Sequence, residues 1–223
     1  MIQLKNIQKY FYKDEEREVH ALNNINLEIQ SGEFSVLTGS SGCGKTTLLN
    51  AIGLLDNINS GEIYFDDKEV AHLSDEQKTS IRLNEMGFVF QAYNLIPVLS
   101  VKENIAFIMR LRGFNDYEIN KRVDELAELL EIKNKLDSLP SLLSGGQQQR
   151  VAVARAVASK PKIILADEPT ANLDHKNSES LMHMMKELNQ KENITILFAS
   201  HDDYVVEMAT RVIHLKDGAL TKG

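Results

Sequence analysis

The sequence has one cysteine and no long apolar run, and each absence excludes a class of protein. A single cysteine among 223 residues rules out an internal disulfide, and no four-ligand zinc pattern is present. No apolar stretch approaches the ~18 residues needed to span a bilayer. The N-terminal residues resemble neither a signal peptide nor a transit peptide, so we expect the protein in the cytoplasm.

An excess of positive charge is also missing. Lys and Arg number 25 against 32 Asp and Glu, which leaves a net charge of −7. General binding to nucleic acid is therefore not favoured, and any phosphate binding must come from local geometry. Repeats, low-complexity segments and proline-rich linkers are absent, and 223 residues suffice for one large domain.

One stretch supplies that local geometry. Residues 39–46 read Gly-Ser-Ser-Gly-Cys-Gly-Lys-Thr and fit the phosphate-loop pattern G-x-x-x-x-G-K-[ST]. An apolar run at 34–38 predicts a buried strand before the loop, and the spacing at 46–55 predicts a helix after it. Backbone N–H groups and the helix dipole would cradle phosphate oxygens, with Lys45 near the β- and γ-phosphates and Thr46 on Mg²⁺. The alternative, a structural glycine turn, does not explain why Lys and Thr directly follow the last glycine of the pattern. The predicted nucleotide-binding residues of the loop are Gly39, Ser40, Ser41, Gly42, Cys43, Gly44, Lys45, Thr46 and Thr47.

A second apolar run ends in two acids. Residues 163–166 predict a buried strand, and Asp167 and Glu168 follow it directly. A carboxylate at a strand tip opposite a phosphate loop can hold Mg²⁺, which we assign to Asp167. Glu168 then remains to orient or deprotonate the attacking water. A plain helix cap or turn is the alternative.

Residues 143–150 form another unusual stretch, Leu-Ser-Gly-Gly-Gln-Gln-Gln-Arg. A serine and two glycines lead into the apolar helix pattern of residues 151–158. Such a helix N-terminus can receive a phosphate, and it is equally the start of a well-capped structural helix. Local physics leaves both interpretations open.

The remaining pattern places these motifs in an α/β fold. Apolar or alternating runs predict further strands at residues 2–7, 22–29, 62–65, 194–198 and 212–215. Helical spacing predicts helices at residues 101–133, 147–158 and 175–190, and a charged turn lies at 13–18. The alternation of strands and helices in the second half is typical of a parallel sheet.

In this order, the motifs resemble those of the ATP-binding-cassette ATPases over essentially the whole chain. Residues 143–150 look like that family's signature motif, and Gln91 looks like the glutamine of its lid loop. Residues 171–174 resemble its dimer-contact loop, and His201 resembles its switch histidine.

The resemblance implies a fold. It is a P-loop NTPase (RecA-like) α/β core with an antiparallel β subdomain and an inserted α-helical subdomain. We expect one domain, with residues 1–91 and 161–223 forming the core and residues 92–160 the helical part.

The resemblance also implies a mechanism. Two such chains pair head to tail as a homodimer, with two ATP molecules between them. One chain supplies the phosphate loop, the Mg²⁺ ligands Thr46, Gln91 and Asp167, and the catalytic residues Glu168, His201 and Gln91. Its partner supplies the signature residues Ser144, Gly145, Gly146 and Gln147, while Asp174 lies in the dimer-contact loop.

Three further residues are assigned with open alternatives. Tyr12 precedes the charged turn, where the family has an aromatic residue that stacks on adenine, although Tyr10 and Phe11 are its neighbours. Val19 is expected to cover the base or, equally, to pack in the core. Cys43 is either a thiol made reactive by Lys45 and the helix N-terminus or simply a filler of the loop, which we favour.

We therefore interpret the chain as an ATP hydrolase that drives a separate membrane permease from the inner face of the cell membrane. Tyr93, Leu95, Ile96 and Pro97 are expected near the permease contact. Residues 18–23, 53–56, 87–97 and 165–174 resemble the macrolide-exporter and lipoprotein-release group, which works by mechanotransmission and includes a cell-division regulator. Cassette ATPases of DNA repair or translation are unfavoured alternatives, because they carry coiled coils, zinc modules or a second cassette.

Overall fold

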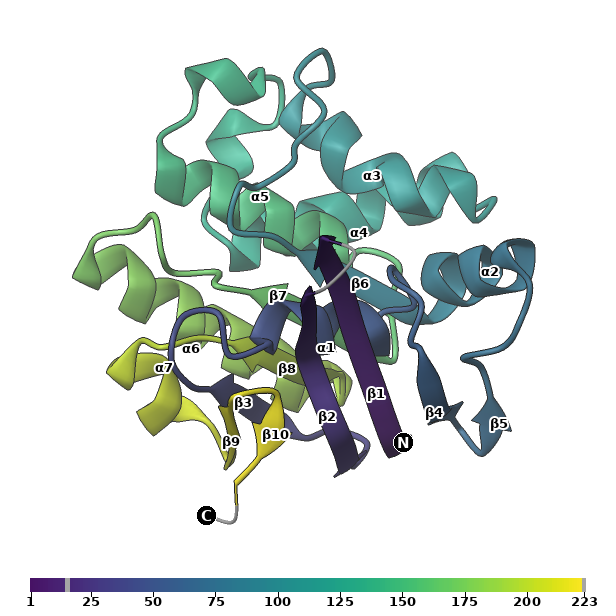
Figure 1. Ribbon diagram of the computed structural model, residues 1–223. Coiled ribbons are helices and arrows are strands. Elements are labelled where there is room, and N and C mark those ends of the chain that lie inside the picture. The colour runs from purple at the N-terminus through teal and green to yellow at the C-terminus, as the bar shows by residue number, and fades with distance from the viewer. Residues whose placement is uncertain (15–16, 222–223) are drawn as a thin grey trace.

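The computed structural model describes residues 1–14 and 17–221 of the chain (Figure 1). Within these ranges no helix combines the length and the apolar character needed to cross a membrane. The described residues form two sheets, and the larger one carries the phosphate loop, Asp167, Glu168 and His201 at a single edge.

The larger sheet has six strands in the order β10-β9-β3-β8-β7-β6. All pairings in it are parallel except the one between β10 and β9. Parallel strands end at the same edge, so the phosphate loop after β3, the acids after β7 and His201 after β8 come together. The strands are β3 (Phe34–Thr38), β6 (Met86–Val89), β7 (Ile163–Asp167), β8 (Thr195–Ala199), β9 (Arg211–Lys216) and β10 (Ala219–Leu220).

A four-stranded antiparallel sheet in the order β2-β1-β4-β5 forms the second layer. Its strands are β1 (Ile2–Asp14), β2 (Arg17–Ile29), β4 (Ser60–Phe65) and β5 (Lys68–Glu69). Strands β1 and β2 extend beyond the predicted ranges, residues 2–7 and 22–29. The sequence pattern ends early because the alternation of apolar and polar residues changes phase along each strand. Asn6 and Asn24 have φ of 52° and 53°, and the register of the hairpin shifts beside Asn6. The middle of the predicted charged turn, residues 15–16, lies outside the described residues.

Seven α-helices lie in the described part of the chain. They are α1 (Lys45–Ile52), α2 (Asp75–Glu85), α3 (Val101–Leu111), α4 (Asp116–Leu129), α5 (Gly145–Val157), α6 (His175–Glu192) and α7 (Asp203–Met208). Two short 3₁₀ helices, at Lys133–Lys135 and Pro140–Leu142, connect α4 to α5.

The helical pattern predicted over residues 101–133 is confirmed, and the structure divides it. Two helices occupy this stretch, because Gly113 has a φ of 78° after α3 and Asn115 caps α4 in a capping box with Glu118. The sequence pattern also missed α2, although its capping box of Ser74 and Gln77 was a usable signal.

Figure 1 shows α3, α4 and α5 gathered at one end of the molecule, with β1 and β2 running side by side across the larger sheet. Both faces of the parallel strands are covered. In β8, Ile196 and Phe198 pack with residues of α3 to α6, whereas Leu197 and Ala199 pack with α1 and the antiparallel sheet. This two-sided burial explains the continuous apolar runs in the sequence. The apolar core of α3 to α5 continues into the sheet, and the division at residues 92 and 160 stays a prediction.

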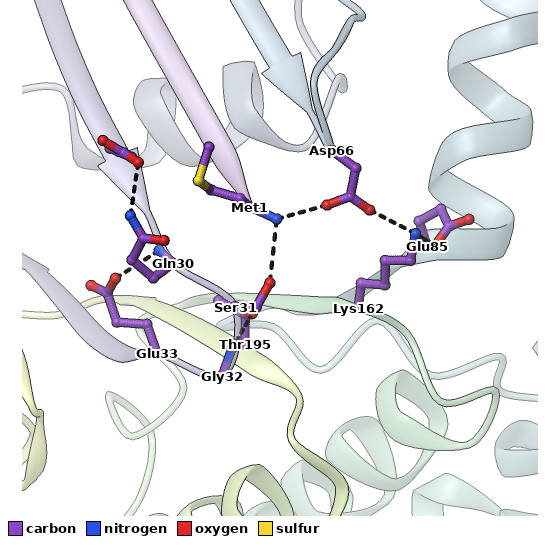
Figure 2. Close-up of polar contacts among 10 residues, drawn as sticks. Met1, Gln30, Ser31, Gly32, Glu33, Asp66, Glu85, Lys162 and Thr195 are labelled. Atoms are coloured by element: carbon purple, nitrogen blue, oxygen red, sulfur yellow. Dashed lines mark hydrogen bonds and ion pairs between the residues drawn. The ribbon is translucent and has the colours of Figure 1, made fainter.

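The two sheets are joined at the edge opposite the motifs, as Figure 2 shows. Asp66, in the turn between β4 and β5, accepts hydrogen bonds of 2.7 Å from the Met1 amine and of 2.7 Å from Lys162 Nζ. Lys162 precedes β7 and also pairs with Glu85 at 3.2 Å. The hydrogen bonds from Lys162 and from the Met1 amine lower the pKa of Asp66.

Candidate nucleotide-binding site

The loop of residues 39–44 joins β3 to α1 in a conformation that requires glycine. Gly44 has a φ of 108°, and a Cβ there would lie 2.4 Å from the carbonyl oxygen of Ala21. The loop therefore passes closely under β2 before α1 begins at Lys45. This is the strand, glycine turn and helix start that the motif predicts.

Lys45 folds back over the loop. Its Nζ donates hydrogen bonds to the carbonyl oxygens of Gly39 at 2.8 Å and Ser40 at 3.2 Å. The residue is 8 % exposed, so the ammonium group is held inside the concave side of the loop. A positive charge fixed there is well placed to meet phosphate oxygens.

Thr46 and Asp167 lie together across 121 residues of sequence. The Thr46 hydroxyl donates to Asp167 Oδ2 at 3.0 Å and lies 3.2 Å from Oδ1. Burial raises the pKa of Asp167; the hydrogen bond from Thr46 and the charge of Lys45 lower it, while the charge of Glu168 raises it.

This hydroxyl and carboxylate fit a Mg²⁺ ion, which prefers oxygen ligands. Over the described ranges no group of three or more His, Cys, Asp or Glu residues could hold a metal ion. Mg²⁺ usually takes one or two carboxylates from a protein and its other ligands from phosphate oxygens and water.

Glu168 and His201 form the next pair. Glu168 has a φ of 47°, and its N–H donates to the carbonyl oxygen of Ala199 at 2.8 Å. Glu168 Oε1 lies 2.8 Å from His201 Nδ1, and the Glu168 side chain is 16 % exposed against 73 % for His201. The backbone hydrogen bond to Ala199 and the contact with His201 fix the position of this carboxylate at the strand tip.

A cavity of about 630 Å³ is lined by the phosphate loop, Glu168 and His201. Gln91 lines it from the lid loop, which we define as residues 90–100 between β6 and α3. The Gln91 carbonyl accepts a hydrogen bond from Asn172 Nδ2 at 2.9 Å, so the lid loop is tied to the predicted dimer-contact loop. The lining residues are Val19, His20, Ala21, Gly39, Ser40, Ser41, Gly42, Gly44, Lys45, Thr46, Thr47, Gln91, Glu168, Ala171 and His201.

The hairpin of β1 and β2 closes one end of this cavity. Val19 lines it and is exposed, so the alternative that Val19 packs in the core is wrong. Tyr12 is 70 % exposed and does not line the cavity; its ring meets Tyr10 edge-on at 5.6 Å. His20, to which the sequence analysis gives no role, also lines the cavity next to Val19. His20 pairs with Tyr10 across the hairpin. The sequence alone could not predict this position, because it depends on the register of the two strands.

Cys43 points away from the cavity. It is 4 % exposed and belongs to the apolar cluster that includes Leu37, Leu48 and Leu215. Only its backbone contributes to the loop, through an N–H that donates to the Ser40 carbonyl at 3.2 Å. The burial supports the interpretation of Cys43 as a packing residue.

The predicted signature residues lie elsewhere on the chain. Ser144 caps α5, accepting from the N–H of Gln147 at 3.3 Å while its own N–H donates to Gln147 Oε1 at 3.0 Å. Ser144 is exposed, and residues 144–147 are not among those that line the cavity. Asp174 caps α6 through the N–H of Asn177 at 2.9 Å. Within one chain the structure therefore joins the phosphate loop with Gln91, Asp167, Glu168 and His201 but not with the signature residues.

The comparison with known families decides what this arrangement is. The family model described as ABC transporter matches residues 22–171. The chain belongs to the ABC transporter family. It is 45 % identical over 226 aligned residues to the uncharacterized ABC transporter ATP-binding protein MJ0796 of Methanocaldococcus jannaschii, covering all of this chain and 96 % of that protein.

A second relative of this ABC chain is the macrolide export ATP-binding/permease protein MacB of Campylobacter jejuni. The identity is 43 % over 220 residues, covering 99 % of this chain and 33 % of MacB. The chain thus spans about a third of that larger protein.

A solved dimer of the MJ0796 cassette, in a post-hydrolysis state bound to ADP and Pi, has the same fold as this ABC chain. The TM-score is 0.92 and the identity 42 %, covering 100 % of this chain and 97 % of that one. The predicted fold, a P-loop NTPase core, is confirmed, and the chain is an ATP-binding-cassette ATPase that uses ATP with Mg²⁺.

Proposed function

We propose that this ATPase drives a separate integral-membrane permease by closing on ATP as a head-to-tail homodimer. The observation that carries the proposal is the position of Ser144 at the exposed start of α5, away from the cavity of its own chain. A helix N-terminus preceded by serine and containing two glycines binds anions well. A second copy of the chain is the partner that can bring it to a nucleotide.

In the proposed reaction four side chains of the site have distinct roles. Lys45 and the loop N–H groups bind the phosphates, and Thr46 and Asp167 would hold Mg²⁺, which would neutralise phosphate charge. Glu168 accepts a proton from water as the water oxygen bonds to the γ-phosphorus. The bond from that phosphorus to the oxygen of the leaving ADP breaks, and phosphate is released. Closure and reopening of the dimer then follow the presence of the γ-phosphate.

A second surface supports coupling to a permease. A cavity of about 410 Å³, which we call the lid groove, lies between α2, β6, the lid loop, α3 and α5. Its apolar lining includes Phe88, Phe90 and Phe107. Of the residues expected at the permease contact, Ile96 lines the groove, whereas Leu95 packs on the core. Phe90, the residue before Gln91, lines the groove. A helix docked there would therefore be coupled through the lid loop to the γ-phosphate site.

The similarity to MacB supports a place in the group that couples ATP hydrolysis to export by mechanotransmission. We propose accordingly that the chain sits on the cytoplasmic face of the cell membrane, attached through its permease. The transported substrate would be chosen by the permease.

Sedimentation of purified protein tests the dimer. We expect Glu168→Gln to bind ATP without turning it over and to become a dimer only when ATP is added. Adding Ser144→Arg to this variant should leave the protein a monomer with ATP bound, because the long arginine side chain occupies the space at the start of α5 that the partner's nucleotide needs. A Glu168→Gln, Ser144→Arg protein that dimerises as well as Glu168→Gln alone would refute the head-to-tail arrangement.

A further inference from the structure

Two arginines line the largely apolar lid groove. Arg82 extends from α2 and Arg155 from α5, and the apolar residues around them include Leu55, Met86 and Ile108. No acidic residue is among the described residues that line the groove. The two arginines are therefore the only charged residues among the described residues that line the groove.

Both guanidinium groups bond only to neutral oxygens. Arg82 donates at 2.6 Å to the carbonyl oxygen of Leu54 and at 2.6 Å to the Thr79 hydroxyl. A guanidinium has five N–H groups, so donors remain for another acceptor. In the described part of the chain, the arginines with carboxylate partners are Arg122, Arg150 and Arg211.

Arg155 connects the groove to the ATP site. It donates to the carbonyl oxygens of Asn94 at 2.7 Å and Tyr93 at 3.0 Å. Both residues have left-handed backbones, with φ of 59° at Tyr93 and 49° at Asn94, and both follow Gln91 closely in the lid loop. Burial lowers the pKa of Arg155, which means that its charge lacks compensation in the groove. An anion placed there would gain a strong, charge-assisted pairing.

We propose that the lid groove takes an amphipathic helix of the permease whose groove-facing side carries a glutamate or aspartate, paired with Arg82 and Arg155. The proposal rests on the proposed function and specifies the chemistry of the partner. The apolar lining accepts the helix, and the two arginines, which have no carboxylate partner among the described residues, select the acid. Movement of that acid would act on the lid loop through Arg155, because the same guanidinium holds the backbone beside Gln91.

The groove can be probed in the native membrane complex. The tagged full-length chain, carrying a photoreactive benzoylphenylalanine in place of Phe107, is expressed in its own host and irradiated in membranes. The cross-linked segment is then identified by mass spectrometry. We expect a cytoplasmic helix of an integral-membrane protein with an acid on its apolar side. A cross-linked segment without an acid would overturn the proposal.

Charge variants give the second measurement, the amount of permease recovered with the tagged chain after detergent solubilisation. Arg82→Gln should reduce recovery about tenfold or more, because it leaves the partner's acid buried and unpaired. Arg82→Lys should retain most of it, and exchanging charges between Arg82→Glu and an acid-to-lysine change in the cross-linked helix should restore it. Arg112→Gln is the matched control, since Arg112 also bonds a backbone carbonyl, that of Ser159 at 2.6 Å, but lies outside the groove.

The outcomes separate the two proposals. If the wild-type chain recovers no membrane protein, the proposed function itself fails. If the wild-type chain recovers a permease and the folded Arg82→Gln variant recovers as much, the proposed function stands and the acidic partner is refuted. Thermal unfolding of each variant shows whether it is folded, and Arg82 carries the test because Arg155 also supports the lid loop.

Discussion

Glu168 Oε1 lies 2.8 Å from His201 Nδ1, and this contact joins the carboxylate after β7 to the imidazole after β8. A neutral imidazole carries one N–H. When Nδ1 donates it to Glu168, Nε2 remains as the nitrogen that can reach the cavity, which His201 also lines. In this pair Glu168 is the predicted base, and His201 is the group that fixes the orientation of its carboxylate.

Glu168→Gln should retain ATP binding and lose turnover. Without the carboxylate no group at this position accepts the proton of the attacking water, and general-base catalysis contributes roughly 10²–10⁴-fold. Phosphate release measures the turnover, and nucleotide titration measures the binding. The control is Glu207→Gln, which neutralises an exposed acid on α7. Turnover within a fewfold of wild type in Glu168→Gln would show that another group is the base.

His201→Ala should slow turnover because it removes the group that orients the Glu168 carboxylate. If the imidazole acts by orienting that carboxylate, its removal costs little once the carboxylate has gone. We therefore expect Glu168→Gln, His201→Ala to turn over no more slowly than Glu168→Gln alone, whereas His201→Ala slows the wild-type protein. Independent losses that multiply in the double variant would contradict this role and indicate a separate contact of His201 with the nucleotide.

Asp167→Asn should stabilise the protein while it damages turnover. Because burial raises the pKa of Asp167, the folded state binds the proton more tightly than the unfolded state does. That contribution to stability is fully present below the carboxyl's ordinary pKa and is lost as pH rises through the raised value.

Thermal unfolding across pH measures this effect. At pH 7 the Asn variant should melt above wild type, and the gap should close as pH falls toward the ordinary pKa of a carboxyl, about 4. A gap that is constant over this range would mean that ionisation of Asp167 does not carry the difference. Loss of Mg²⁺-dependent phosphate release in the same variant tests its assignment as a metal ligand.

Gln149→Met should also stabilise the fold. Gln149 is 0 % exposed in α5, and neither atom of its side-chain amide has a hydrogen-bond partner over the residues that the structure describes. Leaving a buried polar group unbonded costs about 1–3 kcal/mol. We expect a gain of about 1 kcal/mol in the free energy of unfolding by urea, below the full cost because methionine is larger.

The neighbouring residue provides the control for this change. Gln148 Nε2 donates to the carbonyl oxygen of Leu143 at 3.2 Å, so Gln148→Met removes a bond that exists and should not stabilise. A Gln149→Met protein less stable than wild type would show that the amide is bonded in solution.

Much of the site could be predicted because its parts are contiguous in the chain. The phosphate loop, the acids after residues 163–166 and the cap at Ser144 each depend on local backbone geometry. A glycine turn, the end of an apolar strand and a capping box can all be identified over a few residues. Asn6 and Asn24 show the limit of this approach. The register of the hairpin shifts beside Asn6, so the strands continue where the regular alternation of apolar residues stops.

The sequence by itself thus determined that the chain binds a nucleotide's phosphates with a hard cation, and it predicted a carboxylate base. Only the tertiary structure decided which groups meet. It brought Thr46 to Asp167 across 121 residues, turned Cys43 into the core and His20 toward the cavity, and placed Arg82 and Arg155 in one groove. These outcomes depend on strand order and on the side to which a residue faces, which are set by the packing of distant segments rather than by neighbours in the chain.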